Sequence, residues 1–250
     1  MDSAIGNSPT ARPASNTGSD STSASEPPFE PMPDVHQMIG DYTGARELAL
    51  WGPLVVNGLV RVASDVSVGG VVHARRSWAL TGSLEIKSGS QLTTESDVAT
   101  GSLCVRGPFK SGGLVTVALY AVIYNHVAAP EIRVGGDLYL SFDASVVGGD
   151  ESIDEVSVMG QLIVCKDAKL PLGKVIVLGD LILEDMTFLV VNELIVIGNI
   201  LLSSTSQLVA EKEHVLGRKT VGGEGVYREA PGALNHTVLT RHSSRGNQGV

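Results

Sequence analysis

Residues 175–202 read VIVLGDLILEDMTFLVVNELIVIGNILL, and this segment decides the fold. Aliphatic residues recur at every second position on both sides of two glycines, Gly179 and Gly198. The same unit occurs earlier as Gly160-Gln161-Leu162-Ile163-Val164. Residues two apart in a strand point to the same face, so the pattern predicts two short strands with one buried face. Glycine is expected to allow a sharp corner where the two strands meet.

The unit repeats along the chain. Its anchors are Gly58, Gly82, Gly101, Gly136, Gly160, Gly179 and Gly198, at steps of 24, 19, 35, 24, 19 and 19 residues. The step of 35 divides into 18 and 17 if Leu119 takes the glycine position. Positions two and four before the anchor, and two, four and ten after it, are apolar at all but two of forty sites, Asp97 and Ser111. A short repeat of this kind is typical of solenoid proteins.

One coil of this length cannot bury its inner face, so coils must stack about 4.8 Å apart. The repeat therefore predicts an all-β fold, a single-stranded parallel β-helix (β-solenoid) of about eight coils of 17–24 residues. We expect a right-handed coil, because paired aliphatics around each glycine favour continuous strands; the left-handed β-helix is the alternative. Two loop insertions are expected, around Arg75-Arg76 and around Gly148-Gly149-Asp150-Glu151.

Composition divides the chain into three segments. Residues 1–33 include sixteen Ser, Thr or Pro, and such a segment buries too little apolar surface to order itself. We therefore expect a disordered tail over 1–47, with a short helix or cap in 34–47. The solenoid core spans 48–210. Residues 211–250 are expected to hold a degenerate capping coil near Gly217 and a flexible tail.

Charge and targeting signals narrow the function classes. The net charge of −9 argues against nucleic-acid binding, which needs a concentrated basic surface. The first residues show no secretory or transit signal, and charged residues interrupt the most apolar segment, so membrane attachment is not supported. Cys104 and Cys165 form no disulfide framework, because they fall three coils, about 14 Å, apart. We expect a cytoplasmic protein.

The coils that read Val134-Gly135-Gly136-Asp137-Leu138, Val177-Leu178-Gly179-Asp180-Leu181 and Ile197-Gly198-Asn199-Ile200 resemble those of the bactofilin (polymer-forming cytoskeletal) family. The resemblance covers about 48–210 and specifies a coil pattern rather than functional residues. It implies a right-handed β-helix that polymerises end to end without nucleotide. This chain departs from the family in its longer core, its two insertions and its lack of an obvious hydrophobic membrane-targeting peptide.

Candidate chemistry is sparse, and we expect no catalytic, cofactor or metal site. The six histidines show no metal-ligand spacing. The acidic cluster Asp150, Glu151, Asp154 and Glu155 lacks partners on neighbouring coils for calcium, so a solvated loop is expected. A polar ladder one place after the anchor is interpreted as corner-forming; it comprises Asp137, Gln161, Asp180 and Asn199.

The outward column three places after the anchor changes character along the chain. It begins with Arg61 and Glu85, continues with Cys104, and then becomes apolar. An exposed apolar stripe predicts a covered surface, either by a second subunit or by the chain's own C-terminal tail. The predicted interface residues are Val122, Tyr139, Ile163, Ile182, Leu201, Ile176 and Ile195.

The sequence thus favours a non-enzymatic structural protein that self-assembles through the solenoid into cytoskeletal filaments or scaffolds. Its partners would be other copies of itself, and client proteins that bind the tails. Two alternatives stay open. One is a secreted effector or adhesin-type binding module, and the other is a solenoid enzyme, either a polysaccharide lyase or a left-handed-helix acyltransferase.

Overall fold

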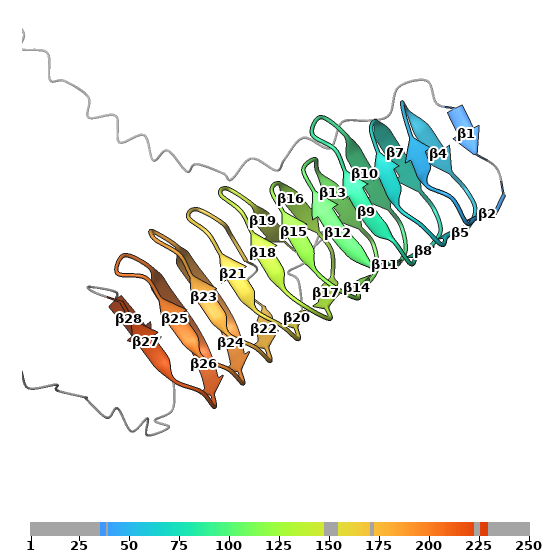
Figure 1. The fold of residues 1–250 in the computed structure, drawn as a ribbon. Helices are drawn as coiled ribbons and strands as arrows, with labels where there is room; N and C mark the ends of the chain where they lie inside the picture. The colour runs from blue at the N-terminus through green and yellow to red at the C-terminus, as the bar shows by residue number, and fades with distance from the viewer. Residues whose placement is uncertain (1–35, 39, 148–154, 171–172, 223–225, 230–250) are drawn as a thin grey trace, which may run out of the picture.

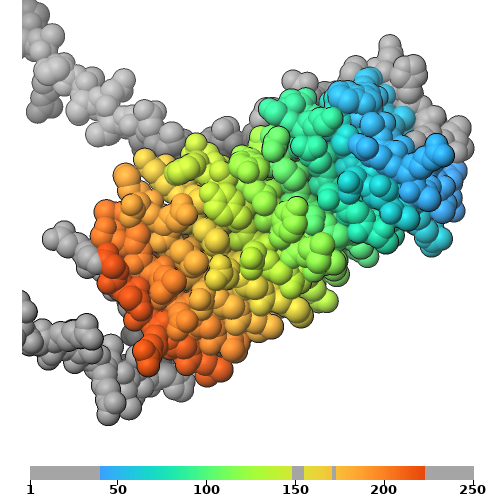
Figure 2. Space-filling model, in the orientation of Figure 1, coloured from blue at the N-terminus to red at the C-terminus, as the bar shows by residue number. Residues whose placement is uncertain are grey.

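A computed structural model of the chain describes residues 36–38, 40–147, 155–170, 173–222 and 226–229. These residues form a β-solenoid of about nine turns in which all strand pairs are parallel. The coils stack along one axis into a rod, with the first and last coils at opposite ends (Figure 1). The space-filling view shows the coils following one another in chain order along the rod (Figure 2). The predicted solenoid is therefore confirmed.

The coils up to residue 147 contribute strands to three sheets that run along the rod, and the later coils contribute strands to two of them. Sheet 1 contains β1 (His36–Met38), β4 (Leu54–Val56), β7 (Val71–Ala74), β10 (Gln91–Thr94), β13 (Phe109–Ser111), β16 (His126–Ala128) and β19 (Ser145–Val147). Sheet 2 contains β2 (Tyr42–Gly44), β5 (Val60–Val62), β8 (Trp78–Leu80), β11 (Val98–Thr100), β14 (Val115–Val117), β17 (Glu131–Val134), β20 (Glu155–Val158), β22 (Lys174–Val177), β24 (Phe188–Val196), β26 (Gln207–Val215) and β28 (Val226–Glu229). Sheet 3 contains β3 (Leu48–Leu50), β6 (Val66–Val68), β9 (Ser83–Ile86), β12 (Ser102–Val105), β15 (Ala121–Ile123), β18 (Leu138–Leu140), β21 (Leu162–Val164), β23 (Leu181–Leu183), β25 (Ile200–Leu202) and β27 (Lys219–Val221).

Alternation of aliphatic and polar residues explains the core. In β21, β23 and β18 the first and third residues are buried and the middle one faces outward. The inward residues of successive coils stack on one another, as Leu138, Leu162 and Leu181 do in sheet 3. Their apolar surface is buried because the coils above and below cover it. The core therefore runs the length of the rod.

The predicted register holds from Leu84 onward in sheet 3. Leu84, Leu103, Ala121 and Leu138 pair in succession. Leu119 also takes the predicted glycine position, because its amide donates to the Gly101 carbonyl at 2.8 Å and its own carbonyl lies against Gly136.

The predicted alignment of residues between the first coils was wrong. Val60 pairs with Trp78 rather than lying level with Leu84, which pairs with Val66 instead. Equivalent residues there are 18 apart, as Asp65 and Ser83 are, so the expected insertion at Arg75-Arg76 is absent. Gly58 lies at a different corner from Gly82. Both corners carry glycine followed by alternating aliphatics, and the local pattern does not distinguish them.

Both exceptions in the apolar columns have structural reasons. Val98, not Asp97, pairs with Trp78 and Val115, so the column shifts by one residue in this coil. Phe109 takes the level of Leu92, whereas Ser111 lies level with Thr94. Thr94 Oγ1 donates to Ser111 Oγ at 3.1 Å, and Ser111 Oγ donates to the Ser96 carbonyl at 3.0 Å. Hydrogen bonding allows these two hydroxyls to be buried.

The ends of the solenoid lie beyond the expected 48–210. The described part of 34–47, expected to hold a short helix or a cap, contains β1 and β2. At the other end, β26 and β27 form the coil predicted near Gly217, and β28 follows. The spacing of 24 residues between Asp137 and Gln161 agrees with the second predicted insertion. The expected loop at 148–151 and the tails 1–33 and 230–250 lie outside the described residues.

Candidate interaction surfaces

The outer face of sheet 3 carries a continuous column of side chains. Pairing in register joins Cys104 to Val122 and continues through the predicted interface residues to Leu201. These are Val122, Tyr139, Ile163, Ile182 and Leu201. Leu201 is exposed, and the other four are half-buried. The structure thus brings these five residues together, although Arg61 belongs to sheet 2 rather than to this column.

The other two predicted interface residues lie on a different face. Ile176 and Ile195 are paired neighbours on the outside of sheet 2. The corner between sheets 2 and 3 carries a further apolar row on four successive coils, Met159, Leu178, Ile197 and Leu216, which are 63%, 43%, 43% and 77% exposed. The predicted stripe is therefore not one flat patch. It follows two sheets and the corner that joins them.

The polar ladder at the corners has a structural role. Asp137 Oδ1 accepts a hydrogen bond from the Gln161 amide at 2.8 Å, and Asp180 Oδ1 accepts one from the Asn199 amide at 2.7 Å. The same contact recurs near the N-terminal end, where Asp65 Oδ1 accepts from the Ser83 amide at 2.7 Å. Each side chain satisfies a backbone donor of the next coil. These hydrogen bonds explain why polar residues recur at this position, and they agree with the interpretation of the ladder as corner-forming.

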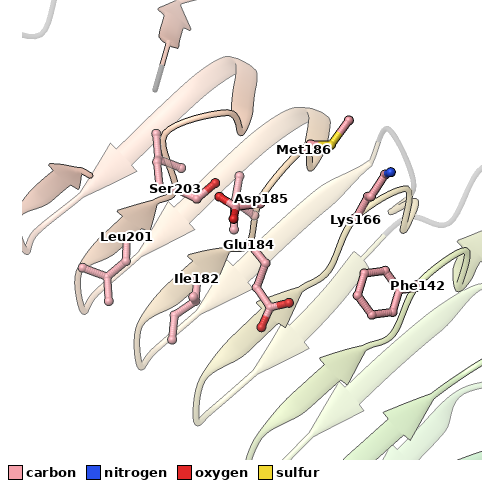
Figure 3. A pocket seen from close by; sticks show the side chains of 10 residues that line it. Phe142, Lys166, Ile182, Glu184, Asp185, Met186, Leu201 and Ser203 are labelled. Carbon is pink, nitrogen blue, oxygen red and sulfur yellow. The ribbon is translucent and has the colours of Figure 1, made fainter. Parts of the chain in front are cut away.

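A shallow groove that sequence reasoning missed lies at the ends of β23 and β25, where the chain turns out of sheet 3. It has a volume of about 520 Å³ and is lined by turn residues as well as by the end of the apolar column (Figure 3). Phe142 and Met186 border it and are 59% and 57% exposed, with the carboxylates of Glu184 and Asp185 close by. The turn residues lie outside the repeating columns, so periodicity gave no signal for them.

Three titratable groups, Tyr139, Cys165 and Cys104, favour their neutral forms. The Tyr139 hydroxyl donates to the Cys165 sulfur, and this hydrogen bond, with some burial, raises the pKa of Tyr139 to about 12. Burial is the main cause that raises the pKa of Cys165 to about 11. Burial likewise raises the pKa of Cys104, the half-buried thiol in β12. None of these three groups is prepared to act as a nucleophile at neutral pH.

The histidines and acidic residues of the described ranges form isolated contacts. His73 Nε2 lies 2.8 Å from Glu95 Oε1, and His126 Nδ1 lies 2.8 Å from Ser145 Oγ, where burial lowers the pKa of His126. Glu155 pairs with Lys174 of the next coil at 3.9 Å. Within these ranges no group of three His, Cys, Asp or Glu side chains could hold a metal ion. Asp150, Glu151 and Asp154 lie outside the described residues.

The two ends of the rod differ in their inner residues. At the N-terminal end Tyr42 and Leu48 pack against the core. At the C-terminal end Glu213 takes the inward position next to Leu194, and Lys219 takes the one next to Ile200. These two side chains form an ion pair while only 12% and 21% exposed. A charged pair thus occupies positions that are aliphatic in the preceding coils.

Comparison with known proteins adds no family assignment. No protein-family model, no curated protein and no solved structure matches this chain. Among the described residues, no helix is long and apolar enough to cross a membrane.

Proposed function

We propose that this chain is a non-enzymatic structural protein whose solenoids join end to end into filaments. One observation carries the proposal. At the N-terminal end the strands β1, β2 and β3 have no described partner on their outer edge, and at the C-terminal end the same holds for β27 and β28. Unpaired strand edges are a ready template for pairing with another chain.

The geometry of the coils favours a head-to-tail joint. Each coil pairs with the next through parallel strands, in three sheets up to β19 and in sheets 2 and 3 beyond it, so the first coil of one copy can follow the last coil of another in the same way. Such a heterologous contact does not close on itself and therefore produces an open filament. In this proposal the filament is a cytoplasmic, cytoskeletal scaffold, and the segments outside the solenoid bind client proteins. The bactofilin-like coil pattern supports the same proposal.

At each end of the rod, one backbone N–H group faces outward, so a proline can replace that residue without removing a hydrogen bond between described coils. The Tyr42 amide donates inward to the Leu59 carbonyl at 2.8 Å, so the Thr43 amide, which points the opposite way, faces the open edge. At the other end the Gly222 amide donates to the Leu202 carbonyl at 3.0 Å, so the Val221 amide faces outward. Proline at Thr43 or Val221 would remove one donor from one end only.

The experiment uses the full chain and sedimentation velocity with negative-stain microscopy. We expect filaments from the unaltered protein and from the controls Thr43→Ala and Val221→Ala, which keep the amides. Thr43→Pro and Val221→Pro should each stay monomeric, and an equimolar mixture should form dimers through the two intact ends. Dimers of either variant alone would show like ends joining and would contradict a head-to-tail filament. A monomeric unaltered protein at every concentration and salt tested would refute self-assembly itself.

A further inference from the structure

The groove beside sheet 3 has the character of a binding surface rather than of ordinary solvated surface. Three large apolar side chains are exposed around it, Phe142 at 59%, Met186 at 57% and Leu201 at 37%. Figure 3 shows Ile182 and Leu201 side by side on neighbouring strands, with Glu184 and Asp185 beside them. Exposed apolar side chains gathered in a concave site generally mark a surface that another segment covers.

The turn that carries Met186 places this side chain at the rim of the groove. This residue has φ +59°, a left-handed conformation that Asp143 and Asp167 also adopt, with φ +57° and +59°, at the equivalent turns of earlier coils. Its amide is held by the Thr205 hydroxyl, which accepts from it at 2.8 Å in the next coil. The turn conformation is therefore shared between coils, and at this turn it holds an exposed methionine at the rim of the groove.

The C-terminal segment 230–250 complements the groove in charge and in apolar content. It contains Arg241 and Arg245 and no acidic residue, so its formal charge is +2. Because the whole chain carries −9, residues 1–229 carry −11. The segment also contains Val238-Leu239 two residues before Arg241. Such a sequence fits a site with apolar side chains and the two adjacent carboxylates of Glu184 and Asp185. Among the described residues, the one cation that lines the groove, Lys166, has its Nζ 3.9 Å from Asp167 Oδ2 and is thus partly neutralised.

The segment starts close enough to reach the groove. β28 ends at Glu229 beside β26, and the next residues read Ala230-Pro231-Gly232-Ala233, a sequence of the kind that favours a type II turn. The groove lies mainly on the coils of β23 and β25, which come two coil spacings and one coil spacing, or ~10 Å and ~5 Å, before the coil of β27 and β28. Residues 230–237, which precede Val238, span roughly 26 Å when extended and so cover this distance with length to spare.

We propose that residues 234–241 bind in the groove of their own chain, with Val238 and Leu239 against Ile182 and Leu201, and Arg241 beside Glu184 and Asp185. Bound there, the segment covers the apolar end of the sheet 3 column. The side of the rod is then shielded from other rods while both ends stay open. The inference does not rest on the proposed function, because a chain that remains monomeric would show the same contact.

Amide hydrogen exchange on the full chain tests this contact, at a concentration below that of any assembly. We expect amides of 234–240 to exchange at least about tenfold more slowly than in a synthetic peptide of residues 230–250. Arg241→Glu should abolish most of this protection, whereas Arg245→Glu, outside the bound segment, should preserve it. Leu201→Asp in the groove should also abolish it, and Thr220→Asp, on the same face beyond the groove, should not.

Three results would overturn the inference. Exchange of 234–240 at the rate of the free peptide would show that the segment does not bind. Equal effects of Arg241→Glu and Arg245→Glu would show that any contact is not the one described. Protection that rises with protein concentration would show that a second copy, not the chain's own segment, occupies the groove. The tail variants leave the core sequence unchanged, so their results do not depend on how the core tolerates Leu201→Asp.

Discussion

At the scale of single residues, the corner glycines are required for space rather than for an unusual backbone angle. Among the described glycines only Gly40, Gly52 and Gly89 have positive φ. A Cβ on Gly160 would lie 2.2 Å from Asp137 Oδ1, the atom that accepts the Gln161 amide. The glycine of one coil therefore makes room for the aspartate of the coil before it. Glycine and aspartate recur together because each makes the other's contact possible.

Gly198→Ala should accordingly destabilise the fold. The new Cβ would lie 2.3 Å from the Gly179 carbonyl oxygen and 2.6 Å from Asp180 Oδ1, so backbone must shift. We expect a loss of about 1–3 kcal/mol in the free energy of unfolding, measured by urea denaturation. Gly222→Ala is the matched control, because its nearest atom would be 3.7 Å away. Equal losses in the two variants would show that close approach does not explain the glycine.

The buried thiol predicts a pH dependence at alkaline pH. Burial raises the pKa of Cys165 from 9.0 in the unfolded chain to about 11 in the folded protein, so the folded state disfavours the thiolate. Its contribution to stability is complete below pH 9 and is lost as the pH rises towards 11.

Urea denaturation at intervals across this range should show the free energy of unfolding falling with pH. Cys165→Ala should make the fall shallower between pH 9 and pH 11, while Cys104→Ala, a half-buried thiol, should change it less. An unchanged slope in Cys165→Ala would mean that the folded protein accommodates the thiolate at no cost.

At the scale of the single coil, inward polar residues have different meanings according to their partners. Thr94 and Ser111 are hydrogen-bonded inside the rod, where they interrupt the aliphatic columns without an unpaired group. Glu213 and Lys219 interrupt the columns with charges at the last complete coil. Two inward columns therefore end with an ion pair, while Val215 and Val221 continue the neighbouring columns, and a coil added beyond them must cover charged as well as aliphatic groups.

Lys219→Leu alone should destabilise the last coils by roughly 1–3 kcal/mol, because it leaves the Glu213 carboxylate in a mostly buried position without this partner. The double variant Glu213→Leu/Lys219→Leu should recover most of this loss, since leucine continues the aliphatic columns. Urea denaturation of the single and double variants measures both effects. A double variant no more stable than the single one would indicate that the ion pair, rather than its burial, sets the stability of this coil.

At the scale of the whole molecule, the solenoid is held together by contacts between neighbouring coils. Leu138 pairs with Ala121 before it and Leu162 after it, and every strand except those at the ends of the sheets has two such neighbours. Stability is then close to a sum of coil and nearest-neighbour contributions, as in other repeat proteins. Two rods that join through their ends would therefore add one more contact of this kind, between the last coil of one rod and the first coil of the next.

Removing a core side chain should therefore destabilise different sets of coils, depending on where the residue lies along the rod. Leu138→Ala, in the middle of the rod, and Leu208→Ala, near its C-terminal end, each remove a fully buried side chain at a cost of about 2–5 kcal/mol. By hydrogen exchange, Leu138→Ala should lower protection on both sides of β18. Leu208→Ala should lower it mainly in β24, β26 and β27. Uniform loss of protection in both variants would mean that the rod unfolds as one unit.

Much of this protein was determined by its sequence alone, because strand alternation and the recurring glycine follow from local rules. The solenoid, the inward columns of sheet 3 from Leu84 onward and the outward apolar residues from Val122 to Leu201 were all predictable from spacing. Only the tertiary structure decided which corner Gly58 occupies, why Ser111 is buried, and that Phe142 and Met186 meet Leu201 in one groove. The physical reason is that these features depend on contacts between neighbouring coils, about 18 residues apart in sequence. Corners with similar local sequences become distinct only when the coils are stacked.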